Sequence, residues 1–207
     1  MANVVCWSCR GVTGPGLFCR TCDAILPVDH GVDFFRLFGL EVGFVVDRTL
    51  LEERYRELQK RLHPDFFASR GAMERRLSLE HVTRVNEALR TLTHPLERAG
   101  YLLRLAGWQE EKIPPDTAFL AEVMEQREAL DEVDPGAGDA HERLATLRAE
   151  AEQRARAEEA RLAEMFVAAF GADGQEWLPR IARHTDRLRY HQRFLEELDR
   201  LEDQAFE

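Results

Sequence analysis

Four cysteines near the start of the chain are the residues whose types and spacing most clearly indicate chemistry. Cys6 and Cys9 are separated by two residues, Cys19 and Cys22 are also separated by two, and nine residues lie between the pairs. This arrangement can bring four thiolates to one tetrahedral metal ion, at Zn–S distances of about 2.3 Å. Four protein ligands leave no coordination position open for a substrate. The spacing therefore predicts a structural Zn²⁺ site.

The segment around these cysteines, residues 1–30, has too few large apolar side chains to form a core of its own. Metal binding would supply the missing folding energy, and Trp7 and Phe18 stand beside the first and third cysteines, where they could cover the site. Paired disulfides, iron or a metal-free state are the alternatives. Disulfides are rare in cytosolic chains of this size, which favours zinc.

His63, Pro64 and Asp65 form a second combination that could do chemistry. A carboxylate can orient an imidazole for general-base catalysis, which gives an enzyme hypothesis. The sequence has no nucleophile motif and no glycine-rich phosphate loop, and the cysteines are assigned to the metal. An isolated triplet of this kind is more often a turn that ends a helix. We expect no enzymatic activity.

Composition and charge exclude several other classes of protein. The 207 residues are 44% apolar and 32% charged, which is typical of one large globular domain or of two to three small ones. The net charge is −10, and residues 108–207 alone carry −12, so a nucleic-acid partner is not expected. The longest apolar run, Met165–Ala172, is too short to span a membrane. The first residues carry no targeting signal, so we expect a cytoplasmic protein.

The middle of the chain has the apolar periodicity of helices. Asp47 can cap a helix that Pro64 ends, a second helix is expected over about 72–92, and Pro95 can begin a third. The first of these helices carries apolar residues four, three and four positions apart, at Leu51, Tyr55, Leu58 and Leu62. One-face stripes of this kind predict a compact all-helical unit.

After a linker over 107–115, which includes Pro115, three more helices are expected. They run over about 116–134, 139–170 and 176–205, with breaks at Pro135 and Gly171. Short turns and apolar stripes favour an antiparallel three-helix bundle. The fold class is therefore mostly α, with a small N-terminal zinc-binding module.

The middle region resembles the J-domain, which combines a cationic helix, a His-Pro-Asp turn and an antiparallel partner helix. Longer stretches resemble the HscB family of iron-sulfur cluster co-chaperones, some members of which carry an N-terminal tetracysteine module. These stretches are Phe34–Leu40, Tyr55–Ala68, Val85–Ala88, Thr91–Leu103, Asp116–Leu120 and Arg127–Glu132.

The resemblance implies three domains: a zinc-binding module over 1–30, a J-domain over 31–107 and a scaffold-binding three-helix bundle over 116–207. It implies a co-chaperone that stimulates an HscA- or DnaK-type chaperone ATPase and delivers the iron-sulfur scaffold protein IscU to it. The residues implied for chaperone binding are His63, Pro64, Asp65, Arg54, Lys60 and Arg61. Those implied for scaffold binding are Leu120, Met124, Glu125, Glu128 and Tyr190.

Several alternatives stay open at this point. Phe66 stands where many relatives have lysine, and Ala121 replaces a larger apolar residue of the scaffold-binding patch. Leu120 and Met124 lie four residues apart on one helix face, which is also the spacing of core residues. The protein could instead be a general J-domain adaptor for other clients, or a zinc-finger nucleic-acid binder, against which the acidic C-terminal half argues.

Overall fold

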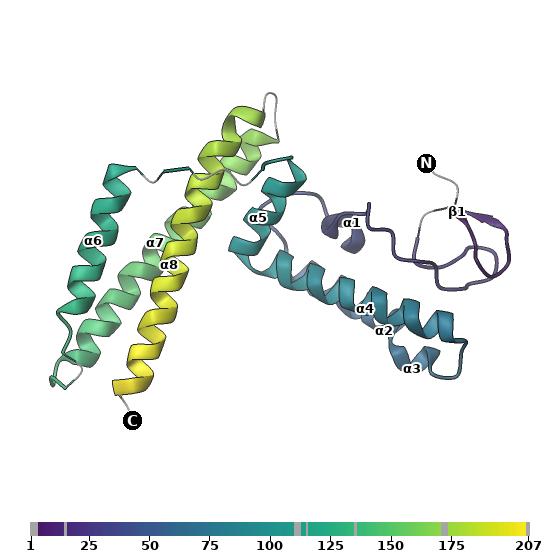
Figure 1. The fold of residues 1–207 in the computed structure, drawn as a ribbon, viewed down its shortest axis with the longest axis horizontal. Helices are drawn as coiled ribbons and strands as arrows, with labels where there is room; N and C mark the ends of the chain where they lie inside the picture. The colour runs from purple at the N-terminus through teal and green to yellow at the C-terminus, as the bar shows by residue number, and fades with distance from the viewer. Residues whose placement is uncertain are drawn as a thin grey trace. The chain divides into compact units, whose positions relative to one another are not determined.

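The computed structural model describes residues 4–14, 16–109, 113–114, 116–134, 136–170 and 174–205. Pro115, Pro135 and Gly171, which marked a linker and two breaks in the sequence, lie outside these ranges. The described residues are mostly helical and begin with a small cysteine-containing module (Figure 1). The predicted fold class is confirmed.

The chain divides into two compact units, residues 1–42 with 46–94 and residues 43–45 with 95–207. The helix over 95–105 therefore groups with the C-terminal helices. The domain boundaries expected at 30, 107 and 116 stay a prediction about which segments fold on their own.

The first unit consists of the tetracysteine module, as we call residues 1–30, and a helical part. The described part of the module contains a two-stranded antiparallel sheet in which Val5 pairs with Val12. In the helical part, the two longest helices, α2 and α4, pack against each other. The elements are β1 (Val4–Val5), β2 (Val12–Thr13), α1 (Phe34–Phe38), α2 (Arg48–Leu62), α3 (Pro64–Phe67) and α4 (Ala72–Thr93).

Local signals explain where these helices begin and end. Asp47 caps α2 as predicted, since its carboxylate accepts the backbone N–H of Leu50 at 3.1 Å. Asp33 caps α1 in the same way, and Gly39 ends it in the left-handed conformation, φ 66°. Helical structure was predicted from Phe34 onward, but the sequence pattern did not show that α1 and α3 are separate short helices.

The second unit contains a helical bundle whose main contact lies between α7 and α8. Figure 1 shows α6, α7 and α8 side by side. No helix in the described ranges is both long and apolar enough to cross a membrane. The elements are α5 (Pro95–Leu105), α6 (Thr117–Asp131), α7 (Ala140–Ala169), a 3₁₀ turn (Gly174–Trp177) and α8 (Leu178–Ala205).

The bundle core is apolar at one end and ionic in its middle. Leu130, Leu144 and Phe194 belong to one buried cluster. Further along α7, Glu158 is 4% exposed, and its carboxylate is surrounded by basic side chains. Its oxygens lie 2.5 Å from His184 Nδ1, 2.9 Å from an Arg161 nitrogen and 3.7 Å from an Arg187 nitrogen. A buried carboxylate is tolerated here because it is paired.

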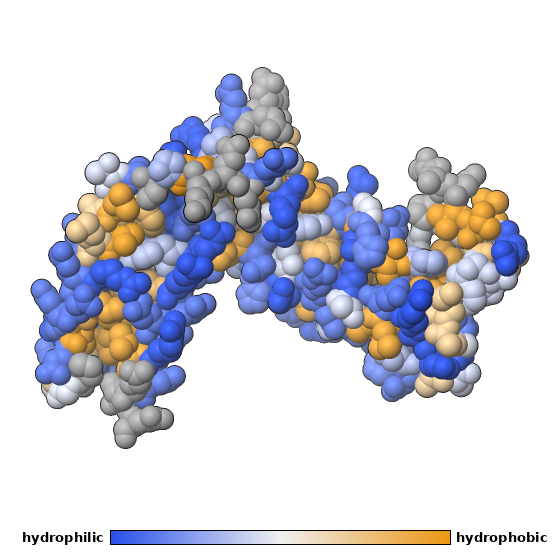
Figure 2. All heavy atoms as spheres, viewed as in Figure 1, coloured by the Kyte–Doolittle hydropathy of each residue, from blue (hydrophilic) through white to orange (hydrophobic). Residues whose placement is uncertain are grey.

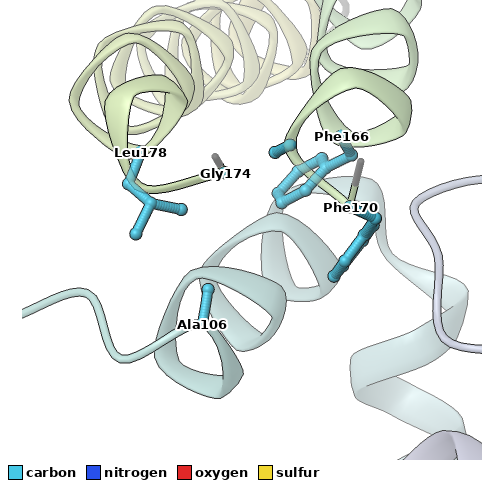
Figure 3. A pocket seen from close by; sticks show the side chains of 6 residues that line it. Ala106, Phe166, Phe170, Gly174 and Leu178 are labelled. Atoms are coloured by element: carbon cyan, nitrogen blue, oxygen red, sulfur yellow. The ribbon is translucent and has the colours of Figure 1, made fainter. Parts of the chain in front are cut away.

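An apolar cavity of about 280 Å³ lies in the same unit (Figure 3). The figure shows the rings of Phe166 and Phe170 on one side of it and the side chain of Leu178 on the other. The described lining residues carry no titratable group. These described residues therefore offer no acid, base or nucleophile at the cavity.

The buried carboxylate makes the stability of the fold depend on pH. Burial raises the pKa of Glu158, but the hydrogen bond with His184 and the nearby arginines outweigh it and hold the pKa below the ordinary 4.5. A lowered pKa stabilises the fold fully above pH 4.5, and this contribution is lost as the pH falls through the folded-state pKa. Glu158→Gln should lower the free energy of unfolding at pH 7 by about 1.5 to 3 kcal/mol and should flatten its decline below pH 4.5.

The neighbouring Glu159 is a matched control with the opposite sign. Burial raises its pKa above the ordinary value, so its charged form weakens the fold above that value and Glu159→Gln should not destabilise it at pH 7. Denaturant titrations followed by circular dichroism at pH 7 and pH 4 measure both variants. Equal stability of Glu158→Gln and the parent at pH 7 would contradict the stabilising role of the buried carboxylate.

Candidate functional site

The His-Pro-Asp turn joins α2 to α3 and is built from backbone interactions. His63 is both the C-cap of α2 and the N-cap of α3, with φ −57° and ψ 128°. Its Nδ1 accepts the backbone N–H of Asp65 at 3.3 Å. Pro64 is the first residue of α3, a position that suits proline because the missing N–H has no helical partner there. Each residue of the triplet therefore has a local structural task.

The same geometry argues against a catalytic pair. Because His63 Nδ1 accepts a hydrogen bond, the proton of a neutral ring would be on Nε2, so Asp65 does not hold the ring by an Nδ1 proton. The carboxylate oxygen of Asp65 lies 3.5 Å from Nδ1, and its side chain is 88% exposed. A carboxylate in open water gives no desolvated site in which a general base could be tuned. The turn leaves the side chains of His63 and Asp65 exposed to solvent.

Buried anchors on both sides hold the turn in place. Leu62, immediately before it, is 0% exposed, and Phe67, at the end of α3, is 5% exposed. The hydroxyl of Ser78 on α4 donates to the carbonyl of Leu62 at 2.7 Å, in the interior. Ser78 was missed by the sequence analysis, since a single serine in a helical stretch carries no signal of its long-range partner.

The predicted cations of α2 lie at the surface, with Lys60 and Arg61 in the last helical turn before His63 and Arg54 further back along the helix. Arg54, Lys60 and Arg61 are all exposed. Arg54 pairs with Glu57 at 3.2 Å, and the guanidinium of Arg61 lies over the ring of Phe18, 4.7 Å from its centroid. Exposed cations can attract an acidic partner, and salt screens such attraction.

The four cysteine sulfurs come together in the tetracysteine module, as predicted. All four Sγ atoms lie within 4.8 Å of one another, with Cys6 and Cys22 at 3.7 Å and Cys9 and Cys19 at 3.9 Å. Four sulfurs placed tetrahedrally about 2.3 Å from zinc would be about 3.8 Å apart, whereas a disulfide needs about 2.05 Å. The donor set and its spacing fit a tetrahedral metal site.

Two similar turns shape this cluster. In one, the N–H of Arg10 donates to the carbonyl of Cys6 at 3.0 Å, and in the other, Asp23 donates to Cys19 at 2.9 Å. Arg10 and Asp23 each follow the second cysteine of a pair, and both have positive φ, 63° and 55°. Backbone N–H groups of Thr21 and Cys22 lower the pKa of the Cys19 thiol to about 6. The thiolate, which is the form that binds metal, is thereby favoured at Cys19. At Cys9 the backbone N–H of Gly11 lowers the pKa, but hydrogen bonds with the other sulfurs and burial outweigh it and raise the pKa of that thiol to about 11.

The predicted scaffold-binding residues lie along α6 and α8 in the second unit. Leu120 and Met124 are 46% and 62% exposed, and Glu125 and Glu128 are exposed beside them. Figure 2 shows apolar side chains gathered over the first half of α6. The alternative that Leu120 and Met124 fill the bundle core is therefore wrong. Phe119, which is 8% exposed, points inward instead.

Tyr190 is half-buried rather than fully exposed. Its hydroxyl donates to the carbonyl of Val123 at 3.5 Å, and its ring meets that of Phe119 edge to face at 5.7 Å. The Tyr190 ring also stacks on that of Phe194, with 6.2 Å between the centroids. Tyr190 thus connects the core of the bundle to the surface of α6.

Comparison with known proteins identifies the family. Residues 115–199 match the family model described as the HSCB C-terminal oligomerisation domain. An iron-sulfur cluster co-chaperone protein HscB homolog of Arabidopsis thaliana is 35% identical over 195 residues, which span 93% of this chain and 72% of the relative. A co-chaperone protein HscB homolog of Shewanella halifaxensis is 36% identical over 179 residues, 85% of this chain and all of the relative. The solved structure of chaperone HscB from Vibrio cholerae matches with a TM-score of 0.73 and 33% identity, covering 84% of this chain and 99% of that one.

The helical unit with its exposed His-Pro-Asp turn and the helical bundle together define a J-type co-chaperone. The chain belongs to the HscB family of iron-sulfur cluster co-chaperones. The resemblance seen in the sequence is confirmed, with a cysteine cluster that fits a zinc module. The relatives are named as co-chaperones, which is consistent with a protein that is not an enzyme.

Proposed function

We propose that this protein stimulates the ATPase of an HscA- or DnaK-type chaperone and delivers the scaffold protein IscU to it. The observation that carries the proposal is the His-Pro-Asp turn, whose polar groups face solvent while Leu62 and Phe67 fix it from inside. A rigid, exposed turn can act on a partner without the cost of ordering a flexible loop. The protein alone hydrolyses nothing in this proposal, because His63 and Asp65 act on the docked ATPase.

Docking on the chaperone would use both the turn and the charged surface of α2. Arg54, Lys60 and Arg61 are exposed, and the role proposed for them is to steer an acidic surface of the ATPase into register. His63 offers Nε2 to that partner because Nδ1 already accepts the N–H of Asp65. The imidazole and the Asp65 carboxylate would then contact the ATPase directly.

The surface of α6 is the proposed binding site for the scaffold. Leu120 and Met124 form an exposed apolar centre, and Glu125 and Glu128 form a polar rim. Apolar centres with charged rims are typical of protein interfaces. Tyr190 would support this surface from below, because its hydroxyl contacts the backbone of α6 at Val123.

The tetracysteine module holds one structural Zn²⁺ in this proposal. Cys6, Cys9, Cys19 and Cys22 would complete a closed tetrahedral shell, and the ion would supply folding energy rather than catalysis. The buried apolar residues of the module are few and cluster around Cys6, Cys19 and Leu26. A small core of this kind depends on a further crosslink.

Replacing His63 tests the proposal most directly. His63→Gln should abolish the stimulation of chaperone ATPase activity and leave far-UV circular dichroism unchanged, because the His63 side chain is 49% exposed. His94→Gln is a matched control, since His94 is also exposed, ends a helix and precedes a proline. Steady-state ATPase assays with the purified chaperone measure both variants. Normal stimulation by His63→Gln would overturn the docking role of the turn.

Truncating the α6 surface tests scaffold delivery. Met124→Ala should weaken binding of IscU by about 1 to 3 kcal/mol, as central interface residues do, with little change in melting midpoint because Met124 is 62% exposed. Val167→Ala, at an apolar α7 residue that is 74% exposed, serves as the control. Titration calorimetry gives the affinities. Unchanged scaffold affinity of Met124→Ala would point to a general J-domain adaptor for other clients.

Metal analysis tests the zinc proposal. The purified protein should contain about one zinc per chain, and Cys19→Ser should lose the metal and the order of the module while helix content persists. Ser8→Ala, within the first cysteine pair, should keep the metal. Elemental analysis and circular dichroism measure these outcomes. A metal-free parent protein with an ordered module would contradict the zinc assignment.

A further inference from the structure

The tetracysteine module is fixed against the helical part of its own unit. Ile25 and Leu26, at its end, are 0% and 2% exposed. The carbonyl of Leu26 accepts a hydrogen bond from His81 Nε2 on α4 at 2.8 Å, and this contact is buried. The guanidinium of Arg84, one turn further along α4, contacts the carbonyl of Val32 just beyond the module. The module therefore has a defined position on α4.

This position brings the module beside the His-Pro-Asp turn. Figure 1 shows the module and α3 near the N-terminal end of α4. The half-buried ring of Phe18, directly before the metal-binding Cys19, lies under the Arg61 guanidinium at 4.7 Å. Such a cation–π contact restricts the orientation of an exposed arginine. The module thus holds one of the cations assigned to chaperone docking.

A cleft of about 340 Å³ lies between the tetracysteine module and the segment that carries the His-Pro-Asp turn. Phe18 and Asp23 of the module line one side of it, and Lys60 and Phe66 are among the residues that line the other. Phe66 follows the turn directly, is 66% exposed, and meets the His63 ring at nearly a right angle, 6.3 Å between centroids. Phe18 and Phe66 thus give the cleft an aromatic lining on both sides.

The charges around the cleft define the chemistry of its occupant. Lys60, Arg61 and Arg70 contribute positive charge, and Asp23 contributes one negative charge. Arg70 also pairs with Glu74 at 3.2 Å, which reduces its contribution to the positive charge of the cleft. An acidic segment with a bulky apolar side chain would match both the cations and the aromatic walls. The cleft is continuous with the proposed docking surface, since it shares Lys60 and Arg61 with it.

We propose that the tetracysteine module is the second wall of the chaperone-docking surface. The cleft between Phe18 and Phe66 receives an acidic segment of the ATPase that carries a bulky apolar side chain. The inference rests on the proposed function for the identity of the partner. It adds the module and Phe66 to the docking surface and gives the module a task in binding.

Binding titrations of the full-length protein with the chaperone test this inference. Phe66→Ser should raise the dissociation constant about tenfold, because it removes the exposed apolar ring that lines one side of the cleft. Phe18→Leu should raise it several-fold while the zinc content stays that of the parent, since the aromatic face under Arg61 is lost but the apolar bulk is kept. Asp23→Asn should tighten binding and steepen its salt dependence, because it removes a charge that repels the acidic segment.

Matched controls distinguish the cleft from other surfaces. Val12→Ser changes an apolar residue of the module that is 63% exposed and lies outside the cleft lining, and Leu79→Ser does the same on α4, at 56% exposure. Both should bind the chaperone like the parent. Asparagine at position 23 tolerates the left-handed backbone there, φ 55°, so that variant is expected to fold.

The outcomes separate this inference from the proposed function. If Phe66→Ser and zinc-loaded Phe18→Leu bind the chaperone like the parent, the inference that the cleft binds the ATPase is overturned. The docking role of the turn still stands in that case if His63→Gln abolishes stimulation. Loss of affinity in both variants supports binding at the cleft. This holds even if His63→Gln still stimulates the ATPase, which would overturn the docking role of the turn. The protein could instead self-associate, with Phe66→Ser weakening that association and leaving the affinity for the chaperone unchanged. A second copy of the chain would then be the occupant of the cleft, and the inference would be overturned.

Discussion

The hydrogen bond from the Ser78 hydroxyl to the Leu62 carbonyl is the contact on which the geometry of the His-Pro-Asp turn depends. At the end of α2 the N–H of Phe66 donates to the His63 carbonyl at 3.0 Å, so Leu62, one residue earlier, has lost its usual helical donor. A buried carbonyl without a partner would cost about 1 to 3 kcal/mol, and Ser78 supplies that partner from α4 at 2.7 Å. The bond therefore permits α2 to stop in the interior and the chain to turn sharply outward. His63 and Asp65 are displayed to solvent because their neighbours are secured inside.

A second buried polar contact does the same for the tetracysteine module. His81 donates to the Leu26 carbonyl, and burial lowers the pKa of His81, which favours the neutral ring that can make this single bond without a charge in the core. The module is small, and its cysteines organise two turns rather than a large core. Attachment to α4 therefore gives it a fixed place, beside α3 and the cationic end of α2. The four cysteines and the His-Pro-Asp turn, which are separate motifs in the sequence, therefore lie on the same side of one compact unit.

In the second unit an apolar surface on α6 is exposed while α6 itself stays packed on the bundle. Phe119, Leu130 and the buried face of α6 provide the attachment, and Asp116 caps the helix through the N–H of Phe119 at 2.8 Å. Asp116 also pairs with Arg187, which in turn approaches Glu158 on α7. The ionic cluster thus ties the start of α6 to both long helices. Leu120 and Met124 are left on the outer face, free of any core role.

The sequence by itself determined the long helices and the local chemistry. Helix caps such as Asp47, the proline after His63 and the spacing of the four cysteines act over a few residues, so they can be read without a fold. Tertiary structure decided which faces are covered. The periodicity of α6 was equally consistent with Leu120 and Met124 inside or outside, and only packing against α7 and α8 exposed them and left Tyr190 half-buried. The attachment of Leu26 to His81 joins residues 55 positions apart, and the contact of Phe18 with Arg61 is also non-local. Such contacts depend on the shape of two folded surfaces, and no local pattern in the chain encodes that shape.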